Sequence, residues 1–268
     1  MIIKSVSFLL MAGMMVSSIQ AGKEETNGEE GLASRKKLYI GIGGIFLNFD
    51  TEGAIHSSTL GRGTRISLER DLGYEEENVD FRLEGMYRFG KKHRLGFGYL
   101  LSDRDGLVVL RREIQIGEDI YGIGAELAST FRNQVIKATY HYSFVNKPDL
   151  DVGFIAGFSI FDIDLEINAR GMGDISGVPG DDPFKEEDEF IFPVPVIGFH
   201  FNYRIAPRWI FVSNLEYFAI SYDDWEGSLV DWKAAVDFSL SPRWGILGGF
   251  GLVRINYSEE DLDGWNID

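Results

Sequence analysis

The chain of 268 residues contains no cysteine, so it can form neither a disulfide framework nor a thiolate metal site. Proline is scarce, at seven residues, whereas glycine is abundant, at 32. Basic residues are outnumbered by acidic ones. The resulting net charge of −16 argues against binding of nucleic acid or of an anionic lipid surface through net electrostatics. Beyond the N-terminus, no apolar run is long enough for a transmembrane helix.

The N-terminus has the layout of a secretory signal peptide. A short stretch carrying the single positive charge of Lys4 precedes an apolar core from Val6 to Val16 and a small or polar exit that ends at Ala21. This order predicts export and cleavage after Ala21, with cleavage after Ser18 as the alternative. The apolar core is shorter than the roughly 20 residues that a spanning helix needs.

Two further segments follow the predicted signal peptide (residues 1–21). Residues 22–37, "GKEETNGEEGLASRKK", are polar and predict a flexible lead-in. From Leu38 to Asp268 the composition is uniform, without a second module or a repeat of fixed period. We therefore expect one domain over residues 38–268.

Period-two alternation is the strongest pattern in this domain. In "VDWKAAVDFSL" (Val230 to Leu240), the even positions are apolar and most odd positions are polar, which predicts a two-faced β-strand. The same alternation occurs in Val79 to Phe89, Ile136 to Phe144 and Ile197 to Ile205. Such strands can form a soluble sandwich with an apolar interior, or a membrane barrel with apolar side chains facing lipid.

Three features favour the barrel. Apolar side chains share one face of Leu150 to Ile160 for 11 residues, and a tilted membrane strand needs about 9–11. At Phe161 the apolar phase flips, which predicts a bulge where the strand leaves the bilayer. Aromatic residues near the ends of the apolar runs are typical of an interfacial girdle: Tyr140, Tyr142, Tyr203, Trp209 and Trp244.

The connections alternate between short and long, as in barrels with short periplasmic turns and longer extracellular loops. The short ones are "GKK", "NKPD", "APR" and "SPR", which begin at residues 90, 146, 206 and 241. The long ones cover residues 51–78, 103–118, 170–189 and 223–227. In the first long connection, "ISLERDLGY" (Ile66 to Tyr74) could form a helical turn or an additional strand.

Nine strands are expected, over residues 38–49, 79–89, 94–102, 119–145, 150–167, 190–205, 209–222, 228–240 and 244–257. Bacterial single-chain barrels have an even number of strands. With a periplasmic N-terminus, the ninth strand runs outward and lacks a partner. We therefore expect either that the native chain continues beyond Asp268 with a closing strand, or that a neighbouring segment closes the gap.

The stretches "ISLERDLGY" and "YRFGKKHRLGFGY" (Tyr87 to Tyr99), within this layout, resemble small outer-membrane barrels of Gram-negative bacteria, the class of the OmpA membrane domain, OmpX and OmpW. The resemblance implies an all-β, antiparallel up-and-down barrel of about 8–10 strands in the outer membrane. It implies outer-membrane lipid, lipopolysaccharide and the assembly machinery as partners. It brings no catalytic motif, and no peptidoglycan-binding domain follows.

Charged and histidine side chains gather on the predicted inner face. One interpretation is an ion-pair network that fills a narrow barrel, and the other is a polar conduction path. The predicted lumen residues are Asp80, Arg82, Glu84, Arg88, Lys137, His141, His200, Arg204, Glu216, Asp231, Lys233 and Asp237.

No constellation predicts catalysis, a metal or a cofactor. His141 and Ser143 share a face, but no third member of a triad is evident, and no two histidines have ligand spacing. Four acidic runs, near residues 75, 181, 186 and 259, predict solvated loops, or alternatively divalent-cation bridges to lipopolysaccharide phosphates. We expect a non-enzymatic barrel with a structural or surface-interaction role. A narrow channel and an outer-membrane hydrolase are the alternatives.

Overall fold

The computed structural model describes residues 2–3, 7–21, 32, 37–48, 51–56, 65–75, 77–116, 119–170, 184–222 and 225–259. Its main strands are β2 (Ser7–Ala21), β3 (Leu38–Asn48), β6 (Glu77–Arg88), β7 (His93–Val109), β10 (Glu126–Asn146), β11 (Leu150–Arg170), β12 (Phe184–Ala206), β13 (Trp209–Tyr222), β14 (Trp225–Ser239) and β15 (Trp244–Glu259). Shorter elements are β1 (Ile2–Ile3), β4 (Thr51–His56), β5 (Arg65–Ser67), α1 (Leu68–Asp71), β8 (Ile114–Ile116) and β9 (Asp119–Tyr121).

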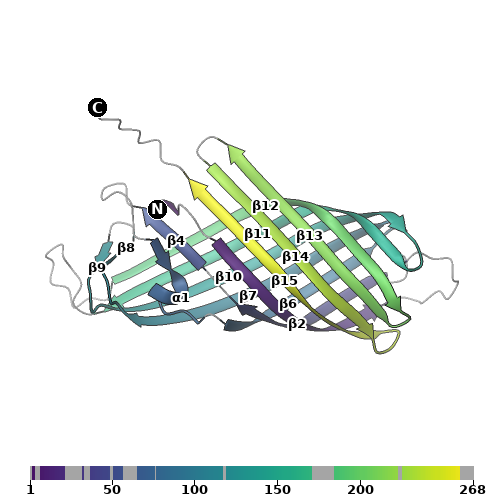
Figure 1. The fold of residues 1–268 in the computed structure, drawn as a ribbon, viewed down its shortest axis with the longest axis horizontal. Coiled ribbons are helices and arrows are strands. Elements are labelled where there is room, and N and C mark those ends of the chain that lie inside the picture. Colours follow the sequence, from purple (N-terminus) through teal and green to yellow (C-terminus); the bar gives the residue numbers. More distant parts are fainter. Residues whose placement is uncertain are drawn as a thin grey trace.

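Ten of these strands form a closed antiparallel ring. From β3 to β15, each main strand pairs with the next along the chain, and β2 then pairs with both β15 and β3. The strands are strongly tilted, with α1, β8 and β9 at one end and the short turns at the other (Figure 1). Pairing continues around the ring at the turn end, as a sheet that crosses lipid requires. Nearer the loops, β12 and β13 are not paired with each other beyond Ile197 and Tyr217.

All nine strands expected between Leu38 and Tyr257 are present. The largest differences are at the loop end, where β7 continues to Val109 and β10 begins only at Glu126. Residues 119–121, expected as the start of β10, instead form the separate strand β9, which pairs with β8. "ISLERDLGY" contains the helical turn α1.

The outer face of the ring carries an apolar band. Its large side chains are exposed along alternate positions of every described wall strand from β3 to β15, as at Ile197, which is 68% exposed, and Phe154, Leu215 and Phe250. Exposed apolar area of this extent requires a lipid environment or a partner surface. The alternation therefore places the apolar face outward, as expected for a membrane barrel and opposite to a soluble sandwich.

The expected bulge at Phe161 is wrong. The register of β11 with β10 and with β12 is continuous through Phe161, and the shift in β10–β11 pairing lies between Ser143 and Val145. The strand itself stays regular, and the apolar phase flips because its inner face becomes apolar and its outer face becomes polar at this level. Phe161 and Ile167 point into a buried cluster inside the ring, while Asp162 lies on the outer wall.

The short turns and the aromatic girdle lie at the same end of the ring. The turn residues after Arg88, Asn146, Ala206 and Ser239 connect consecutive strands there. The five predicted girdle residues are all exposed, between 36% and 49%. Near them, His93 Nδ1 lies 2.6 Å from the Tyr140 hydroxyl. We assign this end to the periplasmic side, in agreement with the expected order of short turns and long loops.

The partner of β15 is β2, the segment in which the sequence predicts the apolar core of a signal peptide. Trp244 pairs with Ile19, and at the other end Ile255 pairs with Phe8. Strand β2 runs from the loop end to the turn end, which is the direction expected for a closing strand. The signal peptide and a continuation beyond Asp268 both stay predictions. Within the described parts of the chain, no helix has the length and apolar character to cross a membrane.

Candidate functional site: the lumen of the barrel

The twelve predicted lumen residues all occupy the inward positions of their strands. They lie on β6, β10, β12, β13 and β14, and alternate with the exposed apolar residues of the outer face. Period-two geometry makes this placement automatic once the outer face is known. Which of these residues meet depends on strand tilt and register, and the structure divides them into separate groups.

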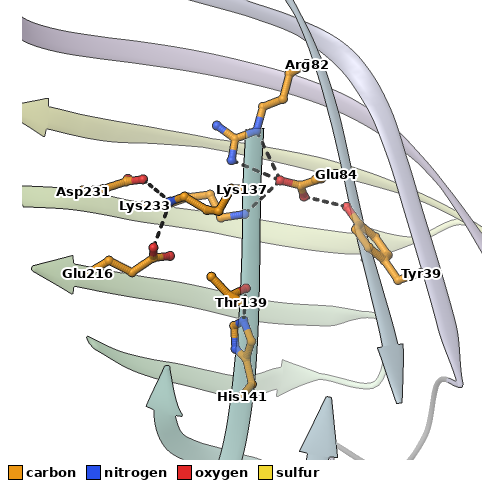
Figure 2. A network of polar contacts seen from close by, with 9 residues as sticks. All are labelled: Tyr39, Arg82, Glu84, Lys137, Thr139, His141, Glu216, Asp231 and Lys233. Carbon is orange, nitrogen blue, oxygen red and sulfur yellow. Dashed lines mark hydrogen bonds and ion pairs between the residues drawn. The ribbon is translucent and has the colours of Figure 1, made fainter. Parts of the chain in front are cut away.

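Seven residues across the middle of the lumen form two sets of polar contacts, one around Glu84 and one around Lys137 (Figure 2). Glu84 of β6 forms an ion pair with Lys233 of β14, whose Nζ lies 3.1 Å from Oε2. Arg82 Nη2 lies 3.2 Å from the same carboxylate oxygen. The Tyr39 hydroxyl donates to the other oxygen at 3.0 Å. Glu84 is only 8% exposed. A buried carboxylate with three donors is satisfied, so its burial carries no unpaired charge.

The other set of contacts centres on Lys137 of β10. Its Nζ lies 2.5 Å from Asp231 of β14 and 2.9 Å from Glu216 of β13. Lys137 and Lys233 therefore reach across the ring in opposite directions, and the ion pairs of these two lysines join strands that are not neighbours. These side chains therefore extend into the interior of the ring.

A second polar cluster lies nearer the turns, around Asp151 of β11. Arg94 Nη2 contacts Asp151 Oδ2 at 2.9 Å, and Asn202 Nδ2 donates to the same oxygen at 2.9 Å. Of the predicted lumen residues, only His200 belongs to this cluster, with Nε2 2.8 Å from Arg94 Nη2. The guanidinium can only donate, whereas Asp151 Oδ1, 3.2 Å from the same Nε2, can only accept. A neutral His200 therefore makes one of these two contacts as a hydrogen bond and not both.

Of the remaining predicted residues, His141 lies beside the second cluster, with its ring centre 5.5 Å from that of His200. His141 contacts Thr139, with its Nε2 3.0 Å from the hydroxyl, and Asp80 accepts from Asn78 at 2.6 Å. Arg204 lies near the turns, 3.7 Å from Asp149. Arg88 and Asp237 occupy inward positions of β6 and β14.

Sequence reasoning missed Tyr39, Arg94 and Asp151. Asp151 stands in a strand that is conspicuous for its apolar face, and Arg94 is the second residue of β7 after a basic turn. The signal was available, because each occupies an inward position next to an apolar residue of the opposite face. Their pairing was not, because Arg94 and Asp151 are 57 positions apart and on strands separated by β10.

Above the ion pairs, the lumen is filled by apolar side chains. Leu72 and Tyr74 from the first long connection pack with Leu127 and Phe131 of β10 and Ile167 of β11. The Tyr74 ring makes an edge contact with Phe131, and the Arg104 guanidinium lies 5.2 Å from the Tyr74 ring centre. Burial raises the pKa of Tyr74 to about 12. The helical turn α1 is tied to this layer by Arg104, whose Nη2 lies 2.8 Å from Glu69.

Below the ion pairs, a cavity of about 620 Å³ reaches toward the short turns. Lys233 and Glu84 line its inner end, and Arg208, Ser241 and Pro242 line its outer end. The polar wall comes from β7, β10, β11 and β12, and an apolar wall comes from β13 and β15.

The arrangement around His200 resembles a hydrolytic triad in composition but not in geometry. Ser143 Oγ at 3.4 Å and Asp151 Oδ1 at 3.2 Å both approach Nε2 of His200. A general base needs the nucleophile and the orienting carboxylate on opposite ring nitrogens. Ser143 and Asp151 are also completely buried. Among the residues that the structure describes, no three His, Asp or Glu side chains are placed to hold a metal ion.

A closed ring of tilted antiparallel strands, an apolar outer band and a polar, side-chain-filled interior define the class: this chain is a β-barrel of the bacterial outer membrane. No family model and no curated protein matches the sequence.

Three solved outer-membrane structures are similar to the chain at low identity. The translocator domain of autotransporter NalP from Neisseria meningitidis is 11% identical, with TM-score 0.37 over 95% of this chain and 88% of that one. Ail, the attachment invasion locus protein of Yersinia pestis, is 10% identical, with TM-score 0.32 over 94% and 97%. The outer membrane protease OmpT from Escherichia coli is 12% identical, with TM-score 0.37 over 96% and 95%.

Proposed function

We propose that this barrel is a non-conducting outer-membrane protein with a structural or surface-interaction role. The observation that carries the proposal is the double obstruction of the lumen. Ion pairs from Lys137 and Lys233 cross the ring at mid-height, and an apolar layer around Phe131 and Ile167 fills it on the loop side. An ion would have to pass both a desolvated apolar layer and a set of satisfied charges.

Single-channel recordings in planar bilayers test this proposal. The wild-type barrel should show no conductance steps. A Lys137→Met, Lys233→Met variant removes the ion pairs, and a Phe131→Ala, Ile167→Ala variant hollows the apolar layer. We expect each double variant to remain closed and only the combination of all four substitutions to conduct. Steps from the wild-type protein would support the narrow channel instead, and the proposal would fail.

We further propose that outward carboxylates above the apolar band contact lipopolysaccharide through divalent cations. Asp103 of β7 and Asp164 of β11 both pair with Arg132 of β10, one on each side. Asp162 lies two residues along β11 from Asp164, closer to the apolar band. The described carboxylates form no three-ligand group of their own, and lipid phosphates would supply further oxygen ligands to a shared cation. In lipopolysaccharide-containing discs, Ca²⁺ should raise the unfolding temperature of the wild type but not of Asp162→Asn, Asp164→Asn. An equal rise in both would contradict this partner.

We propose that the chain is not an enzyme. Support comes from the crowding of Ser143, Asp151 and Arg94 on one nitrogen of His200. Purified protein should hydrolyse ester and peptide substrates no faster than His200→Ala and His141→Ala variants. Activity that is present in the wild type and lost in either variant would overturn this proposal.

A further inference from the structure

The cavity at the turn end of the lumen has two chemically different walls. On one wall, Arg94, Asp151, His200 and Asn202 contact one another through the polar contacts described above. On the other, Ile210 and Val212 of β13 and Leu247 of β15 present aliphatic surface to the same space. Val212 packs against Leu247 and Ala235, so this wall is continuous. Inward aliphatic residues are unexpected in a lumen that only holds water.

The mouth of this cavity carries a cation that is not paired with any carboxylate of the described residues. Arg208, in the turn between β12 and β13, is exposed and lines the cavity, and it makes no ion pair with any described residue. The deeper cations are engaged, Arg94 with Asp151 and Lys233 with Glu84. The described lining contains four cationic side chains, Arg94, Arg204, Arg208 and Lys233, and three carboxylates, Glu84, Asp151 and Asp237. It therefore holds one more cation than carboxylates.

A polar atom without a described hydrogen-bond partner lies deeper in the cavity. His141 is 3% exposed and lines the space, and its Nδ1 has no hydrogen-bond partner among the described residues. Buried polar atoms are normally satisfied by protein, water or a ligand. The volume of about 620 Å³ lies within the range of small-molecule sites.

We propose that this cavity is a binding site, open toward the periplasm, for a small carboxylate with an apolar body. The carboxylate pairs with Arg208 at the mouth, and the apolar body packs on Ile210, Val212 and Leu247. A site of this kind combines apolar contact area with one oriented charge, which is the usual composition of small-ligand pockets. The Lys233–Glu84 pair forms the inner end, so the ligand binds without crossing the barrel.

The chain offers a matched pair of arginines for the test. Arg208 follows Ala206-Pro207, and Arg243 follows Ser241-Pro242 in the turn between β14 and β15. Both arginines are exposed turn residues, but only Arg208 lines the cavity. Neither substitution touches the ring, so both variants should fold like the wild type.

Binding is measured by calorimetry on barrels in phosphatidylcholine discs, with empty discs subtracted. The probes are 4-phenylbutyrate, its uncharged analogue 4-phenylbutan-1-ol, and acetate. Saturable binding of 4-phenylbutyrate is expected, with much weaker binding of the other two. Arg208→Gln should weaken the affinity about fivefold to tenfold, in the range of one charge-assisted contact. Arg243→Gln should leave it unchanged, and Val212→Thr should weaken it by placing a hydroxyl in the apolar wall.

Three results would overturn the inference. They are no saturable binding to the wild type, equal effects of Arg208→Gln and Arg243→Gln, and binding of the alcohol as tight as that of the carboxylate. The calorimetric result does not depend on whether the lumen conducts, because the cavity lies on the turn side of the ion pairs. Failure of this inference and failure of the non-conducting proposal are therefore distinguishable.

Discussion

Glu84 is the residue on which one of the two mid-barrel sets of polar contacts converges. It accepts from Lys233, Arg82 and Tyr39, which come from three different strands. Buried ion pairs add little net stability compared with an apolar filling, but removing one partner leaves a charge in a low-dielectric site. This set of contacts therefore ties strands of the ring together chiefly through the penalty for breaking it.

Lys233→Met tests this penalty. The variant should lose about 1–3 kcal/mol of unfolding free energy, less than for an isolated buried pair because Glu84 keeps two other donors. The measurement is urea unfolding in lipid vesicles. The control is Arg132→Gln, which breaks an outer-wall pair with Asp103 whose two side chains are each 51% exposed. Its unfolding midpoint should not move, and equal losses in the two variants would contradict a special role for the lumen pair.

The assignment of faces is tested on neighbouring residues of β13. Leu215 is 45% exposed on the apolar band, and Asn214 lines the cavity. Leu215→Arg should cost about 2–4 kcal/mol, since a cation near the bilayer midplane on the lipid face is penalised by that amount. Asn214→Ser should be nearly neutral in the same unfolding assay. If the serine variant were the more damaged of the two, the faces would be reversed.

Among the elements, the upper parts of β10 and β11 behave differently from their lower parts. Below the flip at Phe161, each strand presents apolar residues to lipid and polar ones to the lumen. Above it, the outer wall carries Asp162 and Asp164, and the inner face carries Phe161 and Ile167. The upper wall thus has apolar residues inside and polar residues outside, as in a water-soluble sheet. The first long connection supplies part of this apolar interior through Leu72 and Tyr74.

The buried position of Tyr74 makes this element sensitive to high pH. Burial raises the folded-state pKa of Tyr74 from 10.0 to about 12, so its contribution is complete below pH 10 and is lost as pH rises to 12. The loss can reach about 3 kcal/mol, at 1.36 kcal/mol for each pKa unit. Urea unfolding across this range should show a smaller pH-dependent loss for Tyr74→Phe than for the wild type. Parallel curves for the two proteins would rule out Tyr74 as the group.

At the scale of the whole molecule, the ring depends on one strand. Strand β2 supplies the hydrogen-bonding partner for both β15 and β3. Unpaired backbone groups cost several kcal/mol each in lipid, so the ring needs a descending strand at this position. The same residues are predicted to be a cleaved leader, and a molecule that has lost them must pair these two strands with another segment.

Refolding of two chain lengths in detergent separates these cases. Residues 1–268 should give the heat-modifiable electrophoretic shift of a closed barrel. Residues 22–268 should not, because β3 and β15 then present two open edges. The intact mass of the exported protein shows which form occurs in the cell. A shift of equal strength from the shorter chain would mean that β2 is dispensable for closure.

The sequence by itself determined the strands, their two faces and the inward position of every predicted lumen residue. These properties follow from a period of two, which is local: Trp232 and Lys233 point to opposite sides whatever their partners are. The tertiary structure alone decided which inward residues meet. Lys233 reaches Glu84 and Arg94 reaches Asp151 because closure, tilt and register bring distant strands to the same height. It also decided that the flip at Phe161 needs no bulge. Only the folded ring shows that, from Phe161 onward, the inner face of the strand meets an apolar cluster and the outer face carries polar residues.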